Sequence, residues 1–234
     1  GSQKYGALVW SGDVPSTFTY LRNQVVAGLN MGLAGIAWWT ADIGGFHGGN
    51  IHDPAFHELL MRWFQYGTFC PVMRLHGDRD PHKAPMNPEA ICGGGICASG
   101  ADNEIWSYTP QMEEMMVYYI RLRESMKGYI RKTMAEAHEK GTPVIKPLFY
   151  DFPQDAAAWD VEDAYLFGHD LLAAPILTAG ARERELYLPA GAQWTEWETG
   201  TVYDGGQTVR VSAPVDRIPI FIRDGAEVFE QAEE

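Results

Sequence analysis

Three short apolar runs in the first third of the chain each end at a polar side chain close to glycine. The runs cover residues 6–10, 35–39 and 69–73, and the polar side chains that follow them are Asp13, Asp42 and His76. An apolar run that stops at glycine is typical of a buried strand whose C-terminal end opens into a loop. Helical patterns separate the runs, so we expect parallel strands whose C-terminal ends share one face, as in a β/α barrel. The three side chains would then converge on one pocket.

The segments between the runs have the apolar spacing of helices. Residues 18–29 follow a turn in which Ser16 is the expected N-cap, and Asp53 with Pro54 begins a second helix. The first 76 residues therefore predict strand, helix, strand, helix, strand. That is less than half of an eight-stranded barrel and cannot close one. An open doubly wound sheet is the alternative that this pattern leaves.

A long irregular stretch, residues 77–108, comes next and is rich in Gly and Pro. A loop of this length inside a domain is usually functional or mobile. Thr109 and Pro110 then cap one long helix, which we expect to continue to the stop at Lys140 and Gly141. The methionines along this helix lie at helical spacing and are best explained as core.

Short strands punctuated by Gly, Pro and Asp make up the remainder of the chain. We expect them at 144–149, 165–167, 171–177, 185–188, 193–197, 201–203, 208–211 and 218–222. The turn at 204–206, Asp-Gly-Gly, predicts a hairpin. The fold class expected is therefore α/β plus β, a partial (β/α)8 barrel at 1–142 followed by an antiparallel β-sandwich at 143–234.

Composition narrows the class of protein. The net charge is −13 and there is no basic block to neutralise phosphates, so nucleic acid is not an expected partner. We find no apolar run of the length that crosses a membrane, about 20 residues. Three cysteines are an odd number, which favours a reducing, cytoplasmic setting. Of these, Cys92 and Cys97 could close a small loop, but free thiols are the simpler interpretation.

Aromatic residues and carboxylates suggest the chemistry. Eight tryptophans are many for this length, and although most would be core, some could line a sugar-binding cleft. Burial of a carboxyl against an aromatic ring raises its pKa and lets it donate a proton, and glycosidases pair such an acid with a second carboxylate. Asp13, three residues after Trp10, fits the acid, and Asp42 has the equivalent strand-end position. Each could also be an ordinary loop or capping aspartate.

A metal site is the competing interpretation. Six ligand-type side chains lie close together in the sequence: His47, His52, Asp53, His57, His76 and His82. Their spacing matches no metal-binding motif, and Asp53 is already used as an N-cap. We therefore expect no metal ion and no cofactor.

Several motifs together resemble glycoside hydrolase family 31, the retaining α-glucosidases and α-xylosidases. The motifs are Trp-Ser-Gly-Asp at 10–13, Trp-Thr-Ala-Asp-Ile-Gly-Gly-Phe at 39–46, Arg-Leu-His-Gly at 74–77, Arg-Trp-Phe-Gln-Tyr-Gly at 62–67, Pro-Leu-Phe-Tyr-Asp-Phe-Pro at 147–153 and Leu-Ala-Ala-Pro-Ile at 172–176. The resemblance covers nearly the whole chain. It implies the second half of the catalytic barrel and the adjoining C-terminal β-sandwich.

The resemblance also implies roles for particular residues. Asp13 would be the general acid/base of catalysis. The residues that would bind or surround the sugar are Trp10, Trp39, Asp42, Phe46 and His76. Arg74 would support this site without touching the sugar. The family's nucleophilic aspartate belongs to an earlier barrel strand, which these residues do not include.

Partners follow from the same resemblance. The substrate would be an α-linked oligosaccharide, with glucose and xylose equally open. Three strands with unpaired edges would expose apolar surface, so we expect the N-terminal half of the barrel, in the same polypeptide or another, or a second copy of the chain, to cover it. A carbohydrate-binding or scaffold fragment without catalysis is the alternative function.

Overall fold

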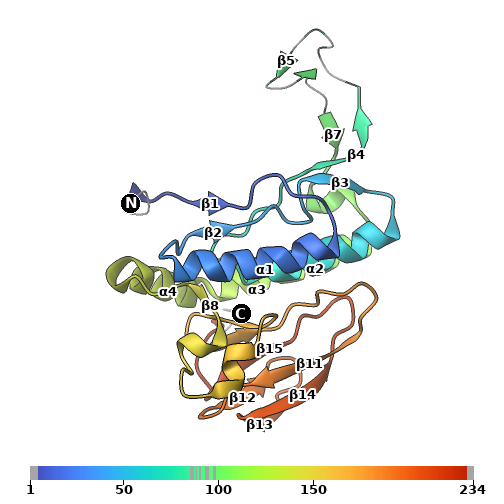
Figure 1. The fold of residues 1–234 in the computed structure, drawn as a ribbon. Coiled ribbons are helices and arrows are strands. Elements are labelled where there is room, and N and C mark those ends of the chain that lie inside the picture. The colour runs from blue at the N-terminus through green and yellow to red at the C-terminus, as the bar shows by residue number, and fades with distance from the viewer. Residues whose placement is uncertain are drawn as a thin grey trace.

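The structure is a computed structural model that describes residues 5–84 and 99–230, together with residues 87, 89, 91, 92, 95 and 96. Three layers follow one another in Figure 1: the strands β1 and β2, the helices α1 to α4, and the C-terminal β-structure. An arm that contains β4, β7 and β5 extends away from these layers. Within the described residues, none of the helices has both the length and the apolar character needed to cross a bilayer.

The first layers contain the predicted β/α units. Their elements are β1 (Val9–Trp10), α1 (Phe18–Leu33), β2 (Trp39–Thr40), β3 (His47–Asn50), α2 (Pro54–Thr68), β4 (Asp78–Lys83), β5 (Ile91–Cys92), β6 (Gly95–Ile96), β7 (Ser99–Ala101), α3 (Pro110–Ser125) and α4 (Lys127–Lys140). Strands β1 and β2 pair in parallel, as expected. Thr17, not the predicted Ser16, caps α1, whereas Asp53 caps α2 as predicted.

The third predicted strand, 69–73, does not form. Its residues complete the C-terminal turn of α2, because the Phe69 and Cys70 N–H groups donate to carbonyls of that helix, and Pro71 has no N–H to offer a ladder. The segment still lies beside β2: the Val72 N–H donates to the Trp39 carbonyl at 3.2 Å, and Leu75 forms an isolated parallel bridge. The segment that follows α2 therefore lies next to β2, as predicted, but does not form a regular strand.

Two further predictions about local structure are wrong. The long helix is broken at Met126 into α3 and α4, because Glu230 occupies the break: its N–H donates to the Ser125 carbonyl and its carboxylate accepts from the Gly128 N–H. The stretch at 77–108 is not wholly irregular, since it contains β4 and β7, which form a small sheet with β3. The structure places Cys70 in the core as a free thiol, and the pairing of Cys92 with Cys97 lies outside the described side chains.

The C-terminal strands form where they are predicted, although those predicted at 144–149 and 171–177 are much shorter, and residues 148–150 form a 3-10 helix. They are β8 (Ile145–Lys146), β9 (Tyr165–Phe167), β10 (Leu171–Ala173), β11 (Glu183–Leu188), β12 (Gln193–Glu196), β13 (Val202–Asp204), β14 (Gln207–Ser212) and β15 (Ile220–Arg223). Six form one sheet in the order β13-β12-β15-β10-β9-β8, and β11 pairs with β14. The turn at 204–206 is not a hairpin, because it carries the chain from one sheet to the other.

The six-stranded sheet is buried on both faces. Along β10 and β15, alternate side chains such as Leu171 and Ile222 belong to the core shared with the helices, whereas Leu172 and Phe221 face the β11–β14 pair. Successive side chains of a strand point to opposite faces, so a strand between two apolar layers is apolar at every position. The sandwich is therefore built against the helices of the barrel segment.

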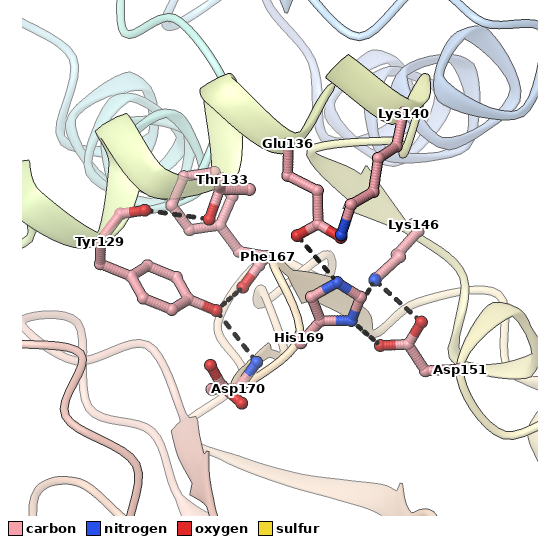
Figure 2. A network of polar contacts seen from close by, with 9 residues as sticks. All are labelled: Tyr129, Thr133, Glu136, Lys140, Lys146, Asp151, Phe167, His169 and Asp170. Atoms are coloured by element: carbon pink, nitrogen blue, oxygen red, sulfur yellow. Dashed lines mark hydrogen bonds and ion pairs between the residues drawn. The ribbon is translucent and has the colours of Figure 1, made fainter. Parts of the chain in front are cut away.

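A polar network joins α4 to the sandwich (Figure 2). Lys146 on β8 is fully buried and pairs with Asp151 at 2.8 Å. His169, in the turn between β9 and β10, lies with Nδ1 2.7 Å from Asp151 and Nε2 3.1 Å from Glu136 of α4. When protonated, the imidazolium donates to both carboxylates; when neutral, its Nδ1 can accept from Lys146, 2.9 Å away. The hydrogen bond to Asp151 raises the pKa of His169 against the effect of burial.

The network predicts a dependence of stability on pH. The pKa of His169 is raised in the folded state, so protonated His169 stabilises the fold. Its contribution to the free energy of unfolding is complete below pH 6.5, the ordinary pKa, and is lost as the pH rises through the pKa of the folded state. Burial acts to raise the pKa of Asp151, but hydrogen bonds from His169 and Lys146 lower it overall. The contribution of Asp151 to the free energy of unfolding is therefore lost only as the pH falls below 3.8. In His169→Gln the decline of the unfolding free energy above pH 6.5 should flatten. Urea unfolding across this range measures the slope, with His138→Gln, at an exposed histidine of α4, as control. An unchanged slope in His169→Gln contradicts the assignment.

Candidate active site

The pairing of β1 with β2 decides which side chains can reach the site. Val9 lies opposite Trp39, and Trp10 lies opposite Thr40. Trp39 is 2% exposed and faces α1, where a Cβ added to Gly28 would lie 2.7 Å from its Nε1. The alternation of a strand then places Trp10 and Thr40 on the face directed away from α1. The prediction that Trp39 contacts substrate is therefore not supported, because its side chain is part of the core.

The loops that follow the strands are joined by backbone hydrogen bonds. The Phe46 N–H donates to the Val14 carbonyl at 2.7 Å, and the Ser16 N–H donates to the His47 carbonyl at 3.0 Å. The Asp78 N–H in turn donates to the Phe46 carbonyl at 2.8 Å. The loops after β1, after β2 and after Leu75 thus form one continuous layer at the strand ends.

Asp42 is the buried acid of this layer. Its side chain is fully buried and its Oδ1 accepts from Arg74 Nη1, so Arg74 supports Asp42 in the way that the motif suggested. Its Oδ2 is also buried and has no hydrogen-bond partner among the described residues. Burial raises the pKa of Asp42, although the charges of Arg74 and His76 act to lower it. An unpartnered buried carboxylate oxygen is costly unless a ligand or another part of the protein binds it.

Asp13 and His76 lie near Asp42, and Phe46 lies beside His76. The charges of Asp13 and His76 both lie near enough to affect the Asp42 pKa, in opposite directions. The rings of Phe46 and His76 lie 5.4 Å apart and are tilted. Asp13 and His76 are both exposed. The structure therefore brings together four of the residues that the sequence proposed.

One part of the expectation for Asp13 is wrong. The sequence argument placed it in an apolar setting beside Trp10, but Asp13 is exposed and Trp10 itself is 51% exposed. Trp38, two residues before Thr40 and therefore on the same strand face as Trp10, is 41% exposed. On this face Trp10 and Trp38 are exposed to solvent, whereas Thr40 is buried.

Three of the six ligand-type side chains of the metal hypothesis make other polar contacts. Asp53 caps α2, the His57 ring lies 2.6 Å from the Ile51 carbonyl, and His82 lies between Asp78 and Asp80. Across the described ranges there is no group of three or more His, Cys, Asp or Glu side chains placed to hold a metal ion.

Sequence reasoning did not single out Arg79. Its side chain is completely buried behind the strand-end loops and donates to backbone carbonyls of Ile43 and His76. The only signal in the sequence is indirect: Gly44 and Gly77 leave the space that its guanidinium fills.

Comparison with known proteins identifies the family. The model of the glycosyl hydrolases family 31 TIM-barrel domain matches residues 1–133, and that of the glycosyl hydrolase family 31 C-terminal domain matches residues 141–228. The chain therefore belongs to glycoside hydrolase family 31, as the motifs indicated.

Three relatives illustrate the similarity. The chain is 35% identical to an α-xylosidase of Saccharolobus solfataricus over 97% of its length, and 36% identical to α-glucosidase 2 of Bacillus thermoamyloliquefaciens over 97%. It superposes with a TM-score of 0.93, at 54% identity over 97% of its length, on the crystal structure of an α-xylosidase from a soil metagenome in complex with xylose. The chain spans 28%, 26% and 34% of these three proteins, respectively.

The joined loops generate a prediction about Gly45. Its φ is +77°, and a Cβ there would lie 2.8 Å from the Ser16 backbone, whereas Gly191 has φ +90° with nothing within 4 Å. Both substitutions place alanine in left-handed backbone, which destabilises the fold by roughly 1–3 kcal/mol. Only Gly45→Ala adds a steric overlap with Ser16, which costs about as much again. Thermal or urea unfolding should show the larger loss for Gly45→Ala. Equal losses in the two variants would mean that the loops separate without cost.

Proposed function

We propose that this chain is part of a retaining α-glycosidase that acts on terminal α-xylosyl or α-glucosyl residues of oligosaccharides. The observation that carries the proposal is the convergence of Asp13, Asp42 and His76 at the ends of neighbouring strands in a family 31 chain. The names of the relatives, α-xylosidase and α-glucosidase, support the same class of substrate.

Asp13 acts as the general acid and then as the general base. Its carboxyl protonates the glycosidic oxygen as the bond to the sugar breaks, and its carboxylate later takes a proton from the water that releases the sugar. An exposed position at the rim of the site suits both steps, because the leaving group and the water arrive from solvent. The apolar setting that an acid needs would come from barrel strands outside these residues.

Asp42 binds the sugar. Arg74 occupies one of its carboxylate oxygens, and the unpartnered Oδ2 is the acceptor for a sugar hydroxyl. His76 offers a second hydrogen bond from the opposite loop, and Phe46 packs beside the His76 ring. Trp10, on the open strand face, forms part of the wall of this subsite.

The nucleophile comes from outside the chain. Retention needs two carboxyl groups about 5–5.5 Å apart. Asp42 is fully buried and paired with Arg74, so it is a poor nucleophile. Within the described residues β1 pairs with β2 alone, and Trp10 and Trp38 lie exposed beside it. We propose that the remaining barrel strands, in the complete polypeptide, cover this face and supply the nucleophile.

The division into two domains remains a proposal. We place it between residues 142 and 143, just after the αL cap of α4 at Gly141. The ends of the two matched family models, at 133 and 141, support a boundary in this region. A cytoplasmic location likewise stays a prediction from the cysteine content.

The test is the turnover of 4-nitrophenyl α-xyloside and α-glucoside, and of the corresponding α-linked disaccharides with poor leaving groups, by the complete polypeptide and its Asp13→Ala variant. General acid catalysis contributes about 10²–10⁴-fold, so glycosides with poor leaving groups should lose that much in kcat. Activated aryl glycosides should lose less, and azide should restore turnover by giving the α-glycosyl azide. Asp204→Ala, at an exposed aspartate of the sandwich, is the control and should retain full activity.

Two outcomes would overturn the proposal. Activity that survives Asp13→Ala on poor leaving groups, without azide rescue on activated ones, removes Asp13 as the acid/base. Sugar binding by the complete polypeptide with no hydrolysis of either glycoside would instead indicate a binding module. The ratio of the two wild-type kcat/KM values decides between xylose and glucose.

A further inference from the structure

Arg79 is a buried guanidinium that contacts all three loops of the candidate site. Nη2 donates to the Ile43 carbonyl at 2.8 Å and to the His76 carbonyl at 3.3 Å. Nη1 donates to Ser16 Oγ and to the Gly48 carbonyl, both at 3.1 Å. Ser16 belongs to the loop of Asp13, Ile43 directly follows Asp42, and His76 is itself a site residue. One side chain therefore connects the three loops that carry the functional groups, through the Ser16 hydroxyl in the first and through backbone carbonyls in the other two.

The surroundings of Arg79 fix its position. The Nε donates to Asn103 Oδ1 at 3.2 Å, and the guanidinium lies over the Phe56 ring with its Cζ 5.0 Å from the centroid. A Cβ on Gly44 would lie 2.7 Å from Nη2, and one on Gly77 would lie 2.5 Å from Cζ. The two glycines that flank Asp42 and His76 therefore leave room for this group and for little else.

Lysine cannot replace this arrangement. A guanidinium offers five N–H donors in a planar fork, whereas an ammonium offers three from a single point. The positive charge of Arg79 also acts on Asp42, since it is one of the charges that oppose the rise of the Asp42 pKa caused by burial. The group thus has a geometric and an electrostatic connection to the site.

We infer that Arg79 is a positioning residue for the glycosidase site: it holds the three strand-end loops in the register that places Asp13, Asp42 and His76 around one sugar ring. The inference rests on the proposed function, because the three residues must act together for the register to matter. Arg79 does not itself touch the substrate.

Arg62 provides a matched comparison within the same chain. Its side chain is equally buried, and its guanidinium donates to Gln65 and to four backbone carbonyls of the sandwich, those of Ala181, Ala213, Pro214 and Arg217. It connects α2 to the sandwich and contacts none of the strand-end loops. A variant of Arg62 should therefore reproduce the loss of stability without the effect on the site.

The experiment compares Arg79→Lys, Arg79→Gln and Arg62→Lys in the complete polypeptide. Misplacement of a catalytic constellation by about 1 Å can cost about 10²-fold, so kcat/KM for the aryl glycosides should fall about 10–100-fold in Arg79→Lys. Arg79→Gln should in addition move the acid limb of the pH profile to higher pH, because the charge that favours ionised Asp42 is lost. Arg62→Lys should lower the melting temperature and leave kcat, KM and the pH profile unchanged.

A second readout does not depend on activity. Hydrogen–deuterium exchange should rise in the loops at 14–17, 43–48 and 74–78 in Arg79→Lys, and not in Arg62→Lys. Asn103→Ala removes the acceptor of Arg79 Nε and also that of the Tyr108 hydroxyl. It serves if the Arg79 variants do not fold, and should give a smaller change of the same kind. Arg79 variants that behave as Arg62→Lys in exchange and in kinetics overturn the inference. A wild type that hydrolyses neither glycoside overturns the proposed function, and exchange then shows separately whether Arg79 holds the loops.

Discussion

The parallel pairing of β1 and β2 is the constraint on which the candidate site depends. Its register sets Val9 against Trp39 and Trp10 against Thr40. The alternation of a strand then sends one set of side chains toward α1 and the other to the opposite face. The same register carries the chain into the two loops that end at Asp13 and Asp42. A shift by one residue would exchange the faces and place Trp39 where the sugar is proposed to bind.

The helices pack against one face of these strands, and the sandwich packs against the helices. The six-stranded sheet is apolar on both faces, so it cannot exist as half of an isolated sandwich; it needs α2, α3 and α4 as its second apolar layer. Buried polar groups fix the contact: the guanidinium of Arg62 binds carbonyls of the sandwich, and Lys146, Asp151 and His169 bind α4 through Glu136. The C-terminal part thus acts as a rigid base for the helices that hold the strand ends.

The sequence predicted the fold where the signal was local. Glycine after an apolar run marked the strand ends, and short apolar segments between turns located the strands of the sandwich. It failed where a distant residue decides the local structure: Glu230 breaks the long helix, and the 204–206 turn joins different sheets because each flanking strand pairs elsewhere. The side of the strand on which Trp39 lies depends on register, which no local pattern contains. Arg79 gave only the indirect signal of Gly44 and Gly77, because an arginine in a segment predicted as a polar loop is usually exposed.

A crystal structure of the complete polypeptide with an iminosugar in its site would test the central claim most directly. We expect the ring to lie at the strand ends, with hydroxyls within hydrogen-bond distance of Asp42 Oδ2 and of His76, and with the Asp13 carboxyl facing the position of the glycosidic oxygen. A ring bound elsewhere, or one that leaves Asp42 Oδ2 without a partner while Asp13 points into solvent, would contradict the account.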